Sequence, residues 1–455
     1  MFFFLLAFLP IALSLLKTTQ KYLTRAKDIP ADIVIDASTQ LGVFVPHWTS
    51  LSQGGEGKEN LLLLVQEPLK NIHPRYIRID HIYDLYDVVS RDTNGTLVYD
   101  FSRLDGIVDA IIDTEALPFF SLSYMPPPLA QDELITSPPK RWSEWQEVVK
   151  TTIEYYSGQK QRNLSNVYYE VWNEPDLFGS WKYSTYPNYL TLYDYAVQGA
   201  AQTDETNPYK IGGPALTRFY ENWIAALLDK AAKDSLRLDF LSWHTYSTNP
   251  QEFVENASKA TEILSRYPKF RAIPLLVTEW GFDSTNHPGY DDNRAAAFTV
   301  ATIKQTINVY DQMFAFEIVD GRDPAGNEYW GRWGLITHPD FGAHLKPRYY
   351  AFTLLSQLSG KLLHIEGEGS FVSAIATHDR GSVKILLSNY DMRNAHTEDV
   401  PLKIYRLSNG NYLKQVTRLG SITTEETVTI AGNEYTNRII MPPNSVVLIE
   451  LIPQP

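Results

Sequence analysis

The chain of 455 residues carries a formal net charge of −13 and contains no cysteine. The absence of cysteine excludes disulfides, cysteine-based zinc sites and thiol nucleophiles, and the acidic balance argues against nucleic acid and anionic membranes as partners. The length exceeds what one small core needs and fits one large domain with a smaller second one.

The first sixteen residues, Met1 to Leu16, are almost wholly apolar, and basic residues follow from Lys17 to Lys27. As a helix this run would be about 24 Å long, short of a bilayer core of about 30 Å. It resembles the apolar core of an export signal, although no basic residue precedes it. We therefore expect residues 1–28 to export the protein or to attach it to a membrane, which predicts a secreted or membrane-attached, extracytoplasmic protein.

Short apolar segments typical of buried strands alternate with helical patterns along the first 359 residues. The predicted strands are Val43–Val45, Tyr76–Ile79, Leu117–Leu122, Val167–Trp172, Tyr209–Gly213, Phe240–His244, Leu275–Glu279 and Phe314–Val319. The predicted helices include Arg103–Glu115, Trp142–Tyr156, Pro187–Ala201, Asn293–Tyr310 and Pro347–Ser359. Eight strand-helix repeats predict an α/β fold of the (β/α)₈ TIM-barrel type over residues 37–359.

The pattern changes after Gly360. Short alternating segments such as Val383–Leu387, Thr427–Ile430 and Ser445–Leu451 follow, separated by glycine, asparagine and aspartate turns. This pattern predicts an antiparallel β-sandwich over residues 360–455, to which Ile33–Ile35 ahead of the barrel is a candidate additional strand.

Two glutamates stand at the ends of predicted strands. Glu174 follows Val167–Trp172 directly after Asn173, and Glu279 ends Leu275–Glu279. In a (β/α)₈ barrel the carboxyl ends of the strands surround the active site. A carboxylate buried there loses hydration, which raises its pKa unless donors stabilise the anion. Glycoside hydrolysis requires two such carboxylates, an acid for the leaving oxygen and an anion that attacks or activates water.

Polar and aromatic residues stand at most other strand ends, which suits a polyhydroxylated substrate. The candidates for substrate binding are Asn173, Arg78, Asp80, His81, Tyr124, His244, Tyr246, Trp280 and Trp333. We expect Arg78 to pair with a buried carboxylate, for which Glu279 is one candidate. Tyr246 either orients Glu279 or packs in the core. No metal or nucleotide motif is present, so we expect no metal and no organic cofactor.

The Asn-Glu-Pro sequence at Glu174 resembles the clan A glycoside hydrolases, retaining (β/α)₈ enzymes that carry this motif on the fourth strand and the nucleophile on the seventh. The best match within the clan is glycoside hydrolase family 39, which includes β-xylosidases, α-L-iduronidases and bacterial exopolysaccharide endoglycosidases. The matching stretches are Glu170–Leu177, Ile211–Pro214, Asp239–Tyr246, Val277–Gly281, Trp333–Ile336 and Lys346-Pro347. Family members often carry Arg-x-His after the second strand, whereas this chain has the longer Arg78-Ile79-Asp80-His81. This difference leaves open whether Asp80 or His81 faces the sugar.

The resemblance implies that Glu174 is the acid/base and Glu279 the nucleophile of a retaining glycosidase, whose partner is an oligo- or polysaccharide. Two alternatives remain open at this point. One is another clan A endo-glycanase, such as a glucanase or mannanase. The other is a non-catalytic carbohydrate-binding protein, because the fold alone does not fix the function.

Overall fold

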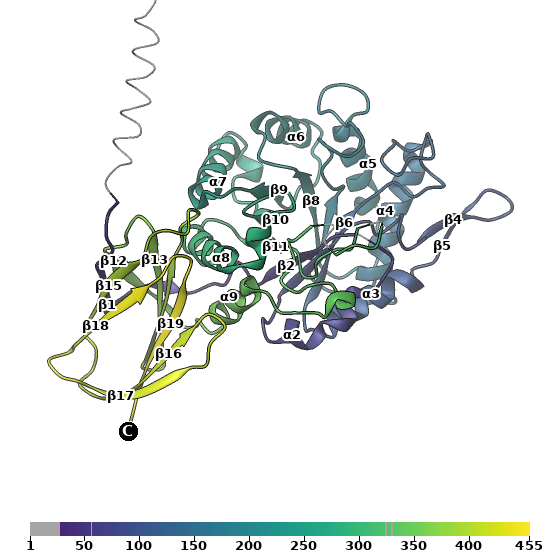
Figure 1. The fold of residues 1–455 in the computed structure, drawn as a ribbon. Helices are drawn as coiled ribbons and strands as arrows, with labels where there is room; N and C mark the ends of the chain where they lie inside the picture. Colours follow the sequence, from purple (N-terminus) through teal and green to yellow (C-terminus); the bar gives the residue numbers. More distant parts are fainter. Residues whose placement is uncertain (1–27, 56, 324, 329–330) are drawn as a thin grey trace, which may run out of the picture. The chain divides into compact units, whose positions relative to one another are not determined.

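The computed structural model describes residues 28–55, 57–323, 325–328 and 331–455, which form two compact units (Figure 1). One unit is Phe44–Leu358, and the other combines the described residues up to Val43 with Ser359–Pro455. Apart from Asp28, the expected export or anchor segment lies outside the described residues. Within the described ranges, no helix is both long enough and apolar enough to cross a membrane.

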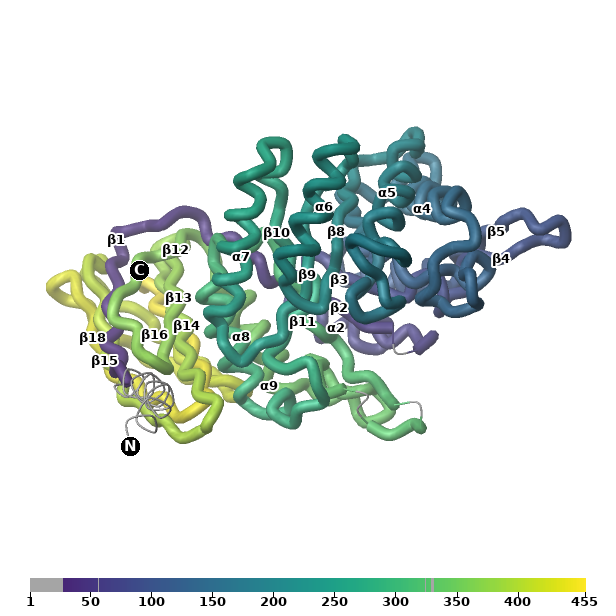
Figure 2. The backbone as a smooth tube through the Cα atoms, turned by 90° about the horizontal axis from the view of Figure 1, so that it is seen from above, coloured from purple at the N-terminus to yellow at the C-terminus, as the bar shows by residue number. Residues whose placement is uncertain are grey.

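Eight parallel strands of the Phe44–Leu358 unit close into a barrel in the order β10-β11-β2-β3-β6-β7-β8-β9, which confirms the predicted TIM barrel. These strands are β2 (Ser50–Gln53), β3 (Tyr76–Ile79), β6 (Leu117–Leu122), β7 (Val167–Val171), β8 (Tyr209–Leu216), β9 (Leu241–Tyr246), β10 (Leu275–Gly281) and β11 (Gln312–Phe316). Figure 2 shows the longer helices outside these strands.

The α-helices of this unit are α2 (Gln66–Lys70), α3 (Ser102–Ile112), α4 (Trp142–Ser157), α5 (Tyr189–Ala201), α6 (Glu221–Lys233), α7 (Pro250–Leu264), α8 (Asn293–Thr306) and α9 (Pro347–Leu355). The unit also contains the hairpin β4 (Val89–Arg91) and β5 (Leu97–Tyr99), and the short 3₁₀ helices η1 (Leu61–Leu64), η2 (Pro268–Phe270), η3 (Pro288–Asp291) and η4 (Pro339–Phe341).

Helix α7 illustrates how the sequence specifies the outer ring. The side chain of Asn249 accepts a hydrogen bond from the Gln251 amide, and Pro250 occupies the first turn, where its missing N–H costs nothing. The buried side chains Phe253, Ala257, Ala260, Ile263 and Leu264 recur at helical spacing and form the face that packs inward.

The prediction that Val43–Val45 forms the first barrel strand is wrong. Ser50–Gln53 takes that place, and Val43 ends β1 of the other unit. Hydrophobicity misleads here because Val43 and Val45 are exposed, whereas Ser52 is buried. The hydroxyl of Ser52 donates to the carbonyl oxygen of Thr278 at 2.9 Å, so its burial leaves no unsatisfied donor.

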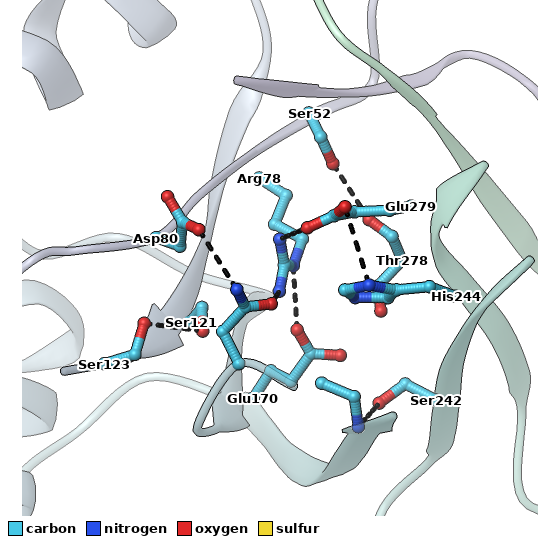
Figure 3. Close-up of polar contacts among 12 residues, drawn as sticks. Ser52, Arg78, Asp80, Ser121, Ser123, Glu170, Ser242, His244, Thr278 and Glu279 are labelled. Carbon is cyan, nitrogen blue, oxygen red and sulfur yellow. Dashed lines mark hydrogen bonds and ion pairs between the residues drawn. The ribbon is translucent and has the colours of Figure 1, made fainter. Parts of the chain in front are cut away.

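The inward-facing side chains of the barrel form layers, because alternate residues of a strand face the same side. The lowest layer is an apolar, mainly aromatic cluster of Tyr76, Phe119, Tyr168, Phe240, Leu276 and Phe314. Two residues farther along, five of these six segments carry a buried polar residue, namely Arg78, Ser121, Glu170, Ser242 and Thr278 (Figure 3). The apolar layer closes one end of the barrel, and the polar layer supports the carboxyl ends of the strands.

The other unit is a nine-stranded sheet in the order β17-β16-β19-β14-β13-β12-β1-β15-β18. Its strands are β1 (Ile33–Val43), β12 (Lys361–Glu366), β13 (Val372–Asp379), β14 (Ser382–Asn389), β15 (Glu398–Tyr405), β16 (Gly410–Arg418), β17 (Thr424–Ile430), β18 (Glu434–Met441) and β19 (Val446–Pro453). Strand β1, purple in Figure 2, pairs antiparallel with β12 and parallel with β15. The parallel pair of β1 and β15 makes the sheet mixed, whereas the strands within residues 360–455 pair antiparallel, as the sequence predicts.

Strand β1 contributes to the core of this unit, where Ile33 and Ile35 are fully buried. Replacing Ile35 by Ala should lower the free energy of unfolding by about 2–5 kcal/mol, because it removes buried methyl groups and leaves a cavity. Urea denaturation followed by far-UV circular dichroism measures the change. Ile422→Ala is the matched control, since Ile422 is 92% exposed and its truncation should change stability by less than about 0.5 kcal/mol. Equal effects of the two substitutions would contradict the placement of β1.

Candidate active site

A pocket of approximately 1510 Å³ opens at the carboxyl ends of the barrel strands. Eight of the residues predicted from the sequence line it: Asp80, His81, Tyr124, Asn173, Glu174, Tyr246, Glu279 and Trp333. The volume exceeds the range of roughly 300–1,000 Å³ usual for small-molecule sites, so the pocket has room for more than one sugar ring. Arg78 and His244 do not line the pocket but contact residues that do, and Trp280 lies elsewhere.

The guanidinium of Arg78 joins three side chains beneath the pocket (Figure 3). Its Nε donates to Glu170 at 2.7 Å, its Nη1 to Glu279 at 2.9 Å and its Nη2 to Asn173 at 2.8 Å. Arg78 is 1% exposed, and Glu170 is fully buried. Burial alone would lower the pKa of Arg78, but the carboxylates of Glu170 and Glu279 outweigh it and raise that pKa. Arg78 is therefore a permanent cation that fixes Glu279 and Asn173.

His244 connects the two predicted catalytic glutamates. Its Nδ1 lies 2.9 Å from Oε1 of Glu174 and 3.5 Å from Oε2 of Glu279. One carboxylate oxygen of Glu174, one of Glu279 and a ring nitrogen of His244 all lie within 4.8 Å of one another. Both neighbours of Nδ1 are carboxylates, so this nitrogen carries the proton.

Burial has the largest effect on the pKa values of Glu279 and His244. It raises the pKa of Glu279 to about 7. The positive charges of His244 and Arg78 lower this pKa, whereas the negative charge of Glu174 raises it further. Burial lowers the pKa of His244, but the charges of Glu279 and Glu174 outweigh it, so that this pKa is raised. The hydroxyl of Tyr246 donates to Oε2 of Glu279 at 3.0 Å, and burial raises its pKa well above the usual range. Tyr246 thus orients Glu279 as a neutral donor.

Glu174 reaches the pocket through an interruption of strand geometry. Tyr168 and Glu170 face the barrel interior, and strict alternation would place Trp172 there next. Strand β7 instead ends at Val171, and Trp172 and Glu174 adopt positive φ angles of 73° and 47°. These left-handed conformations let the consecutive residues Asn173 and Glu174 both line the pocket. Such strain costs about 1–3 kcal/mol for each residue and is typical of functional sites.

The inward orientation of Glu279 depends on a β-bulge in β10. Val277 pairs with Trp243, and Glu279 pairs with the next residue, His244, so β10 contains one extra residue at this point. Without the bulge, alternation from Leu276 would turn Trp280 toward the interior. The bulge brings Glu279 inward instead.

The predicted sugar-binding role of Trp280 is therefore wrong. Its ring packs on Phe253 of α7 and Phe298 of α8, outside the pocket, and the guanidinium of Arg348 lies 5.0 Å from the ring centroid. Trp280 is fully buried and belongs to the layer between barrel and helices. Trp333, by contrast, lines the pocket and is held by a hydrogen bond from its Nε1 to the carbonyl oxygen of Asp283 at 3.2 Å.

One wall of the pocket is a polar network around Asn173. Its Nδ2 donates to the hydroxyl oxygen of Tyr124 at 3.0 Å and to Asp80 at 3.3 Å. His81 packs edge-on against Tyr124, and its Nδ1 lies 2.7 Å from the carboxylate of Asp84. Asp80 and His81 both line the pocket, so the longer sequence after the second barrel strand presents both side chains to a ligand.

The cluster of Glu174, His244 and Glu279 also has the spacing of a metal site. Both carboxylate oxygens of Glu279 already accept hydrogen bonds, Oε1 from Arg78 and Oε2 from Tyr246. A divalent cation at this position would lie beside the buried charge of Arg78. The donor set therefore fits a hydrogen-bonded carboxyl pair better than a metal centre.

Two residues of the site escaped the sequence reasoning. The sequence predicts only a strand position for Glu170, yet this residue is the carboxylate bound to Nε of Arg78. A charged residue at an inward-facing position of an otherwise apolar strand was the available signal. Asp84 orients His81, and its Oδ1 accepts the amide of Tyr124 at 3.0 Å.

Comparison with known proteins identifies the family of the chain. Residues 32–417 match the model of glycosyl hydrolases family 39. A β-xylosidase of Caldicellulosiruptor saccharolyticus is 27% identical over 344 residues, which are 70% of this chain and 69% of that protein. A β-xylosidase of Geobacillus stearothermophilus is 27% identical over 383 residues, 75% of this chain and 73% of that protein.

Among solved structures, a monomeric β-xylosidase from Caulobacter crescentus CB15 superimposes with a TM-score of 0.79 at 22% identity, covering 93% of this chain and all of that one. This likeness shows the shared barrel and β-domain architecture. The family model covers most of the chain, and the chain therefore belongs to glycosyl hydrolases family 39 and is a glycosidase.

Proposed function

We propose that this glycosidase cleaves O-glycosidic bonds with retention of configuration, by double displacement through Glu279 and Glu174. The observation that carries the proposal is the approach of their carboxylate oxygens to within 4.8 Å at the pocket floor. Retaining glycosidases hold their carboxyl groups about 5–5.5 Å apart, whereas inverting enzymes leave about 6.5–9.5 Å for a water molecule.

In the proposed reaction Glu279 attacks the anomeric carbon while Glu174 protonates the departing oxygen. The bond from Glu279 to the sugar replaces the glycosidic bond, and Glu174 is left ionised. Glu174 then takes a proton from water, which attacks the anomeric carbon and releases Glu279.

The donors around the two carboxyls support this division of roles. Glu279 accepts hydrogen bonds from Arg78 and Tyr246, which stabilise its anion, whereas the hydrogen-bond partner of Glu174 is His244. These contacts therefore support Glu279 as the nucleophile, which attacks as the anion, and leave Glu174 as the group that protonates the leaving oxygen.

We propose a β-xyloside or an oligosaccharide ending in one as the first substrate to test, because the two relatives described above, which match over about 70% of their length, are named β-xylosidases. The pocket volume of approximately 1510 Å³ also suits an oligosaccharide. An extracytoplasmic location, as the apolar run at Met1–Leu16 suggests, is part of the proposal, and fractionation of cells with intact-mass analysis tests it.

Replacing Glu279 by Ala should nearly abolish turnover of every substrate, because no nucleophile remains. Replacing Glu174 by Ala should slow cleavage of natural linkages by about 10²–10⁴-fold, while a dinitrophenyl glycoside should still form the intermediate, since its leaving group needs little protonation. Added azide should then give a glycosyl azide of retained configuration with Glu174→Ala and of inverted configuration with Glu279→Ala. Proton NMR distinguishes the two anomers.

The control for these variants is Glu144→Gln. Glu144 of α4 forms a two-point ion pair with Arg91, and neither residue lines the pocket. Activity of this variant should equal that of the wild type. Azide products of the opposite configuration would exchange the two roles, and near-normal turnover in both glutamate variants would place the catalytic pair elsewhere.

The raised pKa of Glu279 also makes the stability of the barrel unit depend on pH. Glutamate in an unfolded chain titrates near pH 4.3, so the folded state, in which this pKa is about 7, retains a proton that the unfolded state loses. Stability should therefore fall as pH rises from about 4.5 to about 7, by about 3 kcal/mol. Glu279→Gln, which mimics the protonated group, should be more stable than wild type at pH 8 and nearly equal to it at pH 4.

Glu144→Gln provides a control of opposite sign. Hydrogen bonds from Arg91 lower the pKa of Glu144, so its contribution is present at pH 8 and is lost in acid, and the substitution should destabilise at pH 8. Urea denaturation followed by tryptophan fluorescence reports the barrel unit, because all ten tryptophans lie between residues 48 and 333. A Glu279→Gln variant that is less stable than the wild type at pH 8 would contradict the conclusion that burial raises the pKa of Glu279.

A further inference from the structure

We propose that Glu170 is the permanent counter-ion of Arg78, a positioning residue that keeps this arginine charge-balanced when Glu279 becomes a neutral glycosyl ester. The inference rests on the proposed double displacement. Glu170 does not line the pocket, and Figure 3 shows its carboxylate on the opposite side of the Arg78 guanidinium from that of Glu279.

The hydrogen bonds of the Glu170 carboxylate among the described residues all go to Arg78. Its Oε2 accepts a hydrogen bond from Nε of Arg78 at 2.7 Å, and its Oε1 has no hydrogen-bond partner among the described residues. The side chain is fully buried. A carboxylate with so little other support is costly to bury, and its ion pair with Arg78 offsets that cost.

The need for a second carboxylate follows from the charges in the reaction. Before attack, Arg78 faces two anions, Glu170 and Glu279. When Glu279 forms its ester, the negative charge of the pair passes to Glu174, which contacts His244 and not Arg78. Without Glu170, Arg78 would then be a buried cation with no anion at hydrogen-bond distance, and the ester intermediate would rise in energy.

Glu170 also limits how strongly Arg78 stabilises the Glu279 anion before attack. The other charged or titratable side chains that face Glu279 are Asp80, Tyr124, Glu174, His244 and Tyr246. Those that face the Arg78–Glu170 pair are Asp80, Tyr189 and His244. Among these side chains, Glu170 is the one that accepts a hydrogen bond from Nε of Arg78. Removing the charge of Glu170 leaves Arg78 to act on Glu279 alone, which makes Glu279 more acidic and less nucleophilic.

The test is Glu170→Gln, whose amide oxygen can still accept the Nε–H of Arg78. With dinitrophenyl β-xyloside, kcat/KM reports formation of the ester and should fall at least about tenfold. When hydrolysis of the ester limits kcat, kcat should be unchanged or higher, because a more acidic Glu279 is the better leaving group. The acid limb of the kcat/KM profile should move to lower pH by about one pH unit.

Two further variants separate charge from packing. Glu170→Asp keeps the charge and should recover most of kcat/KM with an acid limb closer to that of the wild type. Glu144→Gln removes another arginine-bound carboxylate of the same barrel unit and should change neither kinetic parameter. Equal losses of kcat and kcat/KM in Glu170→Gln with an unmoved acid limb, or no change at all, would overturn the proposal.

A measurement that needs no turnover distinguishes failure of this inference from failure of the proposed function. Carbon NMR of glutamate carboxyls, with Glu279 assigned by its loss in Glu279→Gln, gives the titration midpoint of Glu279 directly. A lower midpoint in Glu170→Gln supports the coupling even if wild-type protein cleaves no xyloside, and an unchanged or higher midpoint overturns it. If Glu170→Gln does not fold, Glu170→Asp takes its place. The shorter aspartate holds its carboxylate farther from Arg78, so the titration midpoint of Glu279 should still be slightly lower than in the wild type, and an unchanged or higher midpoint would overturn the proposal. Xyloside cleavage abolished by Glu279→Ala supports the proposed function whatever Glu170 does.

Discussion

The buried charge of Arg78 is the constraint on which the site depends. A guanidinium without access to water needs acceptors in the plane of its fork, and three segments of the barrel supply them: β7 through Glu170, the turn after it through Asn173, and β10 through Glu279. Because the fork is planar and rigid, these acceptors are held in fixed relation to one another. The apolar cluster around Phe119 lies below this arginine, and His244 and Tyr246 bind the two predicted catalytic glutamates beside it.

Both predicted catalytic glutamates occupy positions that regular strands would not give them. Left-handed residues around Asn173 bring Glu174 into the pocket, and a bulge in β10 does the same for Glu279. Departures from local rules of this kind are expected where function overrides stability. The neighbouring side chains show the effect, because Trp172 and Trp280, which alternation would direct inward, are instead buried in the aromatic packing of Trp181 and Phe298.

The barrel and its site differ in how far the sequence predicts them. Repeated strand-helix alternation predicted the barrel, and strand ends followed by Glu174 and Glu279 predicted the residues that the structure brings together. The first strand was misplaced because hydrophobicity favoured Val43–Val45 over a strand of buried, hydrogen-bonded serines. Trp280 was misjudged because a bulge arises from pairing between strands and leaves no mark in a single segment. Glu170 was missed because its partner is 92 residues away in the chain.

The placement of β1 makes the barrel an insertion within the sheet of the other unit. Val34 pairs with Glu366, so 331 residues are synthesised between the two partners. At ribosomal rates of about 5–20 residues per second, β1 waits on the order of 20 to 60 seconds for its neighbour, while the barrel can already fold. A chain released early would carry a folded barrel attached to an unpaired apolar strand, the kind of edge that promotes aggregation. Strand β1 has both of its neighbours, β12 and β15, only after synthesis has passed Tyr405 at the end of β15.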